Sequence, residues 1–270
     1  MTEQPGWAPP GVDPGRANPA RVYDYWLGGS HNFLADQDLG RAMAAIEPNV
    51  RAITRANRAF LGRSVRFLAA SGIRQFLDLG SGIPTQANVH EVAQQAAPGS
   101  RVAYVDIDPV AVAHSKAILA GQDAAVAIQA DLRDPEAILA SADIGRLIDF
   151  SEPAGLLLLA VLHFIADAED PWRILATLRD ALAPGSYLVL SHGTNENDPD
   201  LARAAEKLYN RTASSPAQAR SRAEILRLFD GFTLVDPGLV YLPLWRPDSP
   251  ADVPAEPSRF ANLVGVARKG

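Results

Sequence analysis

From Gly72 onward, short apolar segments alternate with helical segments, and no other feature of the sequence restricts the fold as strongly. The apolar segments carry hydrophobic residues at consecutive positions, so both faces of each segment must be covered. Strands of that kind, separated by helices, predict an α/β fold with a parallel sheet between two helical layers. The expected strands are Gln75–Leu79, Arg101–Asp106, Ala125–Ala130, Gly155–Ala160 and Ser186–Ser191, and the expected helices are Thr85–Ala97, Pro109–Ala120, Glu136–Ala142 and one that starts at Pro171.

The alternation breaks after the fifth of these strands. Residues 193–222 are polar and contain one expected helix around Leu201–Arg211, and a second helix is expected over Glu224–Phe229. Three further strand-like segments fit a hairpin-like pair that closes an otherwise parallel sheet. They are Phe232–Val235, Gly238–Leu242 and Asn262–Ala267.

The N-terminal quarter has a different character. Residues 1–18 are rich in proline and glycine and predict a flexible arm. An aromatic and glycine-rich stretch follows, and a helical pattern then runs from Asp38 to Ala70 with a break expected at Pro48. In that pattern Ile53, Phe60 and Phe67 share one face, while several arginines share the other. These arginines fit either a solvated surface or an anion site, and Arg58 is the one we choose as an anion contact.

Composition excludes several classes of protein. The chain has 270 residues, which suits one large domain, and it has no cysteine. We therefore expect neither a disulfide framework nor a thiolate metal site. The five histidines show no metal-site spacing either, so we expect no metal. The formal net charge of −6 argues against nucleic acid as a partner held by bulk charge. The longest apolar stretch, Ala154–Ala166, is too short to span a membrane, and the first residues lack a secretory signal, so we expect a cytoplasmic protein.

The segment Asp78–Thr85 (DLGSGIPT) carries the clearest chemical signal. It lies at a predicted strand-to-helix turn, where glycines allow a tight turn and a close approach to a ligand. A dinucleotide fingerprint would need a third glycine where Thr85 stands, so a nicotinamide-dependent oxidoreductase ranks last among our hypotheses. A carboxylate at Asp78 would repel a pyrophosphate and suits an ammonium or sulfonium group.

Two further acids end the next two predicted strands. Asp106 stands where a carboxylate accepts both hydroxyls of a ribose, and Asp131 where one can accept the exocyclic amine of adenine. Each acid alone could simply cap a helix. Three in register predict a ligand crevice, because the carboxyl ends of parallel strands meet at one edge of the sheet.

The motifs together resemble a known family. Residues 67–192 look like a class I S-adenosylmethionine-dependent methyltransferase. From residue 19 to the C-terminus, the stretches ARVYDYWLGG, RANRAFLGR, RQFLDLGSGIPT, NVHEVAQ, VDIDP, ADLRDP, LLLLAVLHF and GSYLVLSH resemble an actinomycete-type family of S-adenosyl methyltransferases of unknown function. The resemblance implies a Rossmann-like, mostly parallel sheet of seven strands with helices on both faces. It also implies a helical extension or lid over 19–66 and an S-adenosylmethionine-binding domain over 67–270.

The resemblance also implies a set of cofactor contacts. The adenine end would be held by Asp131 and Leu132, and the ribose by Asp106 and Ile107. We add Gly28 and Gly29 as further expected contacts of the cofactor, and Arg58 as a contact either of the cofactor carboxylate or of an acidic acceptor. The remaining expected contacts are the loop residues Asp78, Gly80, Ser81, Gly82, Pro84 and Thr85, and Leu162 and His163 after the fourth strand.

One position departs from many methyltransferases, which have Asp or Asn where this chain has Ala160. An Asn/Asp-Pro-Pro-Tyr signature is also absent, which argues against N-methylation of DNA bases.

The chemistry requires a donor and an acceptor to be positioned together, with a base where a proton must leave. His163 and His192 follow predicted strands and are our expected bases. The alternative for each is a structural histidine that is hydrogen-bonded near the edge of the sheet. Tyr23 is the third residue that we expect to be catalytic. It belongs to a stretch that closes over the site or, alternatively, packs the extension onto the core. The leading hypothesis is a methyltransferase for a small-molecule acceptor, as a monomer or homodimer, without nucleic-acid or membrane partners. The alternative is a non-catalytic regulatory protein that binds S-adenosylmethionine or S-adenosylhomocysteine.

Overall fold

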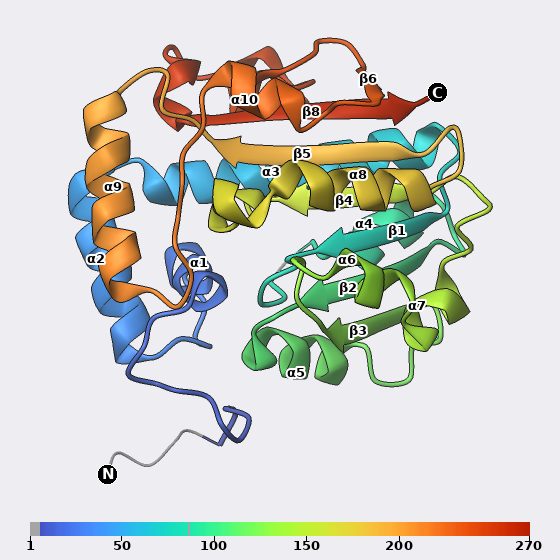
Figure 1. The fold of residues 1–270 in the computed structure, drawn as a ribbon, viewed down its shortest axis with the longest axis horizontal. Helices are drawn as coiled ribbons and strands as arrows, with labels where there is room; N and C mark the ends of the chain where they lie inside the picture. Colours follow the sequence, from blue (N-terminus) through green and yellow to red (C-terminus); the bar gives the residue numbers. More distant parts are fainter. Residues whose placement is uncertain (1–5, 86) are drawn as a thin grey trace.

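Residues 6–85 and 87–270, which the computed structural model describes, form helices around an eight-stranded sheet (Figure 1). The strand order is β3-β2-β1-β4-β5-β8-β6, and the short strand β7 pairs with β8 as well. The strands are β1 Gln75–Leu79, β2 Arg101–Asp106, β3 Ala125–Gln129, β4 Gly155–Leu159, β5 Tyr187–Gly193, β6 Phe232–Leu234, β7 Val240–Tyr241 and β8 Asn262–Lys269.

The first five strands are parallel, and the C-terminal strands complete the sheet in antiparallel fashion. β8 pairs along its length with β5, and Leu190 lies opposite Gly265. β6 pairs with residues 267–269 of β8, and β7 pairs with residues 263–264. The expected number of seven strands is therefore corrected to eight. The sheet is still seven positions wide, because β6 and β7 pair with different parts of the same strand.

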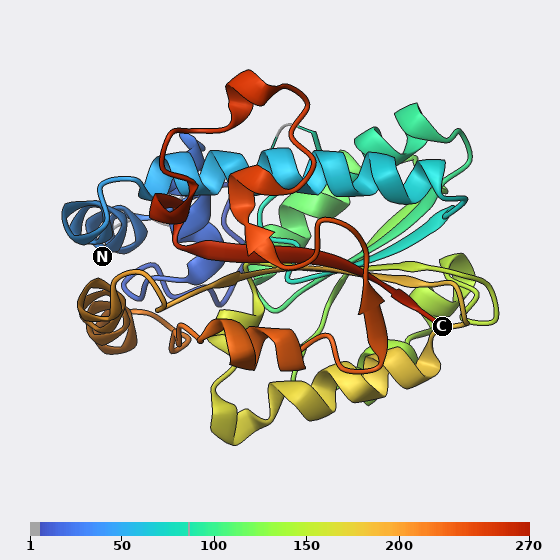
Figure 2. The same cartoon turned by 90° about the horizontal axis from the view of Figure 1, so that it is seen from above.

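Neighbouring residues of each central strand point to opposite faces of the sheet and so belong to two cores. On one face, Leu77 and Leu79 pack against a layer formed by α6, α7, α8 and α10. On the other face, Phe76 packs with α3, α4 and the end of α5. Figure 2 shows α3 and α8 on opposite sides of the sheet. These helices are α3 Val50–Ala70, α4 Val89–Ala96, α5 Pro109–Ile118, α6 Pro135–Leu139, α7 Ala142–Leu147, α8 Pro171–Ala181 and α10 Arg222–Arg227.

Three helices stand across the carboxyl edge of the sheet instead of covering a face (Figure 1). They are α1 Pro19–Leu27, α2 Leu34–Ile46 and α9 Pro199–Thr212. Although α9 lies about 160 residues further along the chain, it shares a small apolar core with α1 and α2, formed by Val22, Leu39, Met43 and Tyr209. Backbone contacts join the same segments, since the N–H of Ser214 donates to the carbonyl of Ala17.

Several helices begin or end at residues other than those expected from the sequence, and local capping explains the difference. α4 begins at Val89 instead of Thr85, because Asn88 and Glu91 form a capping box there. The region expected as one helix over 136–142 is two helices, α6 and α7, with Ser141 before the second. α1 follows Asn18, whose side chain accepts the N–H of Ala20, with Pro19 at the first helical position.

The N-terminal boundaries can now be located on the structure. Residues 1–5 of the expected arm lie outside the described residues, whereas Val12 and Ala17 are buried. α3 is one continuous helix through residue 66, so its second half belongs to the layer that covers the sheet. Among the described residues, no helix is long and apolar enough to cross a membrane.

Candidate functional site

A cavity of about 810 Å³ lies at the carboxyl edge of the sheet. The cavity is lined from the ends of the first four strands by residues 78–82, 105–107, 130–133, 159–161 and 163–165. α1, the end of α2, the first half of α3, and α9 line it from the other side. The three acids expected at successive strand ends, Asp78, Asp106 and Asp131, all line this one cavity.

Asp78 is 4% exposed and is the residue before the last of β1, on the sheet face that α3 covers. Burial raises its pKa to about 7, while Arg58 opposes that shift and Asp106 adds to it. A cation that binds beside such a buried carboxyl stabilises its ionised form. Such perturbed acids are concentrated at functional sites.

The glycine loop after β1 is held by backbone contacts with β2. The N–H of Gly80 donates to the carbonyl of Val105 at 2.8 Å. Gly80 has a φ of +71°, and a Cβ there would lie 2.3 Å from Val161 Cγ2, so a larger residue would be excluded. Gly82 has a φ of +68° and faces open space, while Ser81 also lines the cavity.

Pro84 and Thr85 lie outside the lining of this cavity. Pro84 borders a much smaller pocket behind the loop, and the N–H of Thr85 donates to Asn88 Oδ1 at 3.2 Å. The loop therefore turns toward α4 after Gly82.

Asp106 ends β2 and fixes the geometry of the turns around it. Its carboxylate accepts the N–H of Gly82 at 2.7 Å and that of Asp108 at 2.8 Å. Burial raises its pKa to about 6, although those N–H groups favour the charged form. Ile107 beside it is 45% exposed and lines the cavity, as a residue that covers a ligand would.

Asp131 and Leu132 follow β3 on the same side of the cavity. Asp131 is bonded to Arg133, whose Nε donates at 2.8 Å, and Arg133 also pairs with Glu169 at 3.0 Å. Burial acts to raise the pKa of Asp131, but its hydrogen bonds with Arg133 and the charge of that residue outweigh this effect and lower the pKa.

The two histidines expected near the site occupy different positions. His163 lines the cavity, and burial together with the charge of Arg220 lowers its pKa to about 4. His192 is 0% exposed and lies outside the cavity lining, with Nδ1 2.7 Å from the carbonyl of Gly193 and Nε2 2.7 Å from Arg220. Leu162 is likewise buried in the core behind the site.

Tyr23 of α1 reaches the cavity and contacts α3. Its hydroxyl donates to the carbonyl of Thr54 at 3.2 Å and accepts from Asn57 Nδ2 at 3.0 Å. Burial raises the pKa of Tyr23, and Asn57 and Arg58 oppose this shift. Asn57 Oδ1 is buried without a hydrogen-bond partner among the described residues, and both Asn57 and Arg58 line the cavity. In the sequence, Asn57 lies near the apolar face of its helix, where a buried amide needs hydrogen-bond partners.

Gly28 and Gly29 are exposed and do not line the cavity. Gly28 ends α1 in the left-handed conformation, with a φ of 84°. The N–H of Gly29 donates to the carbonyl of Asp24. The glycine pair therefore shapes the turn between α1 and α2.

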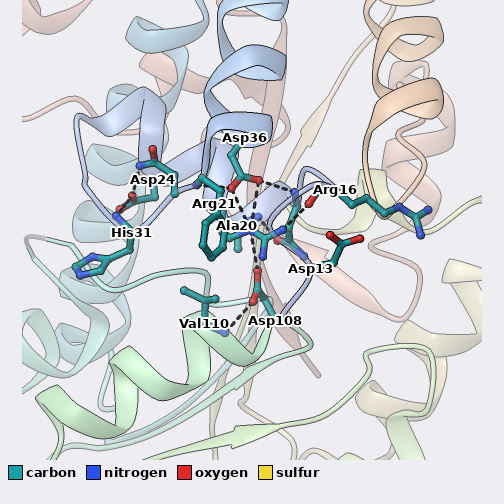
Figure 3. Close-up of polar contacts among 12 residues, drawn as sticks. Asp13, Arg16, Ala20, Arg21, Asp24, His31, Asp36, Asp108 and Val110 are labelled. Atoms are coloured by element: carbon teal, nitrogen blue, oxygen red, sulfur yellow. Dashed lines mark hydrogen bonds and ion pairs between the residues drawn. The ribbon is translucent and has the colours of Figure 1, made fainter. Parts of the chain in front are cut away.

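A buried ionic cluster attaches the extension to the sheet (Figure 3). Arg21 Nε lies 3.2 Å from Asp36 Oδ2 and 3.8 Å from Asp108 Oδ2, and all three side chains are buried. Asp36 also accepts the N–H groups of Asn18 and Phe33 at 2.8 Å each. Sequence analysis missed this cluster, because its members come from α1, α2 and the turn after β2 and share no local pattern.

Comparisons with known proteins give the family. The profile of a family described as S-adenosyl methyltransferase matches residues 5–270. Among solved structures, a candidate methyltransferase from Thermobifida fusca YX is 42% identical, with a TM-score of 0.92 over 98% of this chain and 99% of its own. A DUF574 family protein from Streptomyces avermitilis is 38% identical, with a TM-score of 0.90 over 94% of this chain and 98% of its own.

The pyocyanin biosynthetic protein PhzM, at 19% identity and a TM-score of 0.51, covers 86% of this chain and 60% of its own, and is similar in fold alone. A comparison with curated proteins finds no significant match. The chain belongs to the S-adenosyl methyltransferase family and is an S-adenosylmethionine-dependent methyltransferase.

Proposed function

We propose that this methyltransferase acts on a small molecule held in the cavity at the carboxyl edge of the sheet. The observation that carries the proposal is that this cavity is a walled pocket of limited volume. α1, α2, α3 and α9 wall it opposite the strand ends, and its volume of about 810 Å³ is in the range of small-molecule sites. A polymer would need an open surface groove in the same place.

The residues at the strand ends fit S-adenosylmethionine. Asp106, with Ile107 beside it, would bind the ribose, and Asp131 with Leu132 would bind the adenine. Gly80, Ser81 and Gly82 let the chain approach the ligand, since Gly82 has open space where a side chain would stand. Asp78 and Asn57 Oδ1, which has no hydrogen-bond partner among the described residues, suit the ammonium of the methionine part, and Arg58 suits its carboxylate.

The bound cofactor supplies an electrophilic methyl group on a sulfonium. The protein positions the acceptor, excludes water and accepts a proton where the acceptor must lose one. His163 is the group in the cavity that we assign to this last role. Its imidazole is neutral at pH 7, because its pKa lies near 4, so it can accept a proton but binds it weakly. His192 would act behind it as a positioning residue through Arg220.

The first experiment measures cofactor binding by calorimetry. Asp106→Asn should weaken S-adenosylmethionine binding by at least about tenfold, because hydrogen bonds to a charged group are worth roughly 1.5–3 kcal/mol. Asp123→Asn, at an exposed acid outside the cavity, should bind like the wild type. Normal binding by a folded Asp106→Asn variant would contradict the assigned role of Asp106.

The second experiment uses radiolabelled cofactor and a cell extract as the source of acceptor. The wild type should transfer label to a small product that passes an ultrafiltration membrane. His163→Gln should bind the cofactor normally and lose roughly 10²-fold or more of this transfer. Label retained on protein or nucleic acid would exclude a small-molecule acceptor.

A further inference from the structure

The part of the cavity that lies beyond the strand ends has its own chemical character. Its walls are mostly apolar and aromatic, and the residues that line it include Trp26, Met43, Ile53, Phe164 and Tyr209. They come from α1, α2, α3, α9 and the turn after β4. We call this part the acceptor chamber.

Two carboxylates of the chamber have no basic side chain at ion-pair distance within residues 6–85 and 87–270. Glu47, at the end of α2, accepts the N–H of Asn49 through Oε1 at 2.9 Å. Glu206, on α9, accepts the N–H of Ala219 through Oε1 at 2.6 Å. Within residues 6–85 and 87–270, the other carboxylate oxygen, Oε2, of Glu47 and of Glu206 has no hydrogen-bond partner. Both residues are half-buried and line the cavity.

The arginines around the cavity are already near acids. Arg133 pairs with Asp131, and Arg259 pairs with Glu256. Arg58 lies close enough to Asp78 to influence its pKa, and its guanidinium donates to the carbonyl of Ala87 at 3.0 Å. The field in the chamber therefore comes mainly from acids, Glu47 and Glu206 together with Asp198 at the start of α9, and favours a cation over an anion.

The hydrogen-bonding groups of the chamber also favour a cationic ligand. Trp26 Nε1 donates to the carbonyl of Gly40 at 3.1 Å, and the Tyr23 hydroxyl donates to that of Thr54 at 3.2 Å. These donors are therefore engaged within the protein, whereas the carboxylates can only accept. Tyr209 is 4% exposed, and its hydroxyl has no partner among the residues that the structure describes. This hydroxyl provides one more polar contact for a ligand.

We infer that the methyl acceptor is an apolar, aromatic molecule that carries an amine, and that Glu47 and Glu206 select its charged form. The inference rests on the proposed function, because it names the class of molecule that shares the cavity with the cofactor. The aromatic body lies among Trp26, Phe164 and Tyr209, whose ring faces also attract a cation. The ammonium supplies donors to the two carboxylates, which have no ion-pair partner within residues 6–85 and 87–270.

The test compares three probes of one shape and different charge on protein saturated with S-adenosylhomocysteine. Tryptamine should bind at least about tenfold more tightly than indole-3-propionate, with the uncharged tryptophol between them, and tenfold corresponds to about 1.4 kcal/mol. Glu47→Gln with Glu206→Gln should reduce the difference to about threefold or less. Glutamine at 206 can still accept the N–H of Ala219, so the wall should keep its shape.

Glu152→Gln is the matched control, because Glu152 is exposed and lies outside the cavity. This variant should keep the full preference for tryptamine. The inference is overturned if the acid binds as tightly as the amine, if the preference survives the double substitution, or if none of the probes binds at millimolar concentration. Failure of S-adenosylhomocysteine itself to bind would instead contradict the proposed function.

Discussion

At the residue scale, the ionisation of Asp78 should control cofactor affinity. Its pKa of about 7 in the free protein means that a large part of this carboxyl is protonated just below neutral pH. Only the ionised form attracts an ammonium. S-adenosylmethionine should therefore bind progressively more weakly as the pH falls from 8 to 6, by up to about tenfold per unit below the pKa. Calorimetry at pH 6, 7 and 8 measures this, and affinity that rises toward pH 6 would contradict it.

Ionisation of Asp78 should have the opposite effect on the stability of the ligand-free protein: it should lower stability as the pH rises. Its folded pKa lies above the unfolded value of 3.8, so its stabilising contribution is complete at low pH and is lost as the pH rises toward 7. Asp78→Asn without ligand should therefore have a higher Tm than the wild type at pH 8, and the difference should narrow toward pH 5. Scanning calorimetry at both pH values measures the difference. An equal or lower Tm of the variant at pH 8 would show that the buried charge costs nothing.

At the element scale, the attachment of α1 and α2 to the sheet depends on Arg21. Arg21→Met would leave Asp36 and Asp108 buried without their cation, which typically costs about 3–5 kcal/mol. Denaturant unfolding should show this loss, while Arg41→Met, at an exposed pair on α2, should change little. Partial recovery on adding Asp36→Asn would identify the unpaired charge as the cause. Unchanged stability of Arg21→Met would contradict the role of Arg21 in this attachment.

At the scale of the whole molecule, ligand binding should act on segments far apart in the sequence. S-adenosylhomocysteine at about 100 times its Kd stabilises the folded state by about 2.7 kcal/mol, or roughly 5–10 °C in Tm for a chain of this size. Amide exchange should slow together in Pro19–Leu27 and Pro199–Thr212, because α1 and α9 wall one cavity. Protection restricted to the strand ends would show that the two helices do not respond to the ligand.

Much of the sheet and of its ligand edge could be predicted from local pattern. Consecutive apolar residues identified the parallel strands, and parallel strands place their carboxyl ends together, so Asp78, Asp106 and Asp131 were expected at one site. Those expectations depend only on the order of residues within each segment and on the direction of the chain. Local pattern could not predict the position of a residue whose contacts are with segments distant in the sequence.

Three-dimensional packing settled everything that depends on such distant neighbours. His192 looked equivalent to His163 from its place after a strand, yet it is enclosed by Arg220, and only His163 of the two lines the cavity. Gly28 and Gly29 form a turn outside the cavity. The wall formed by α2 and α9 joins segments about 160 residues apart. Each helix has an apolar face at helical spacing, Leu39 with Met43 and Ala205 with Tyr209, but neither pattern identifies the other helix as its partner. Local pattern therefore predicts the edge that binds the cofactor, whereas long-range packing determines the chamber for the acceptor.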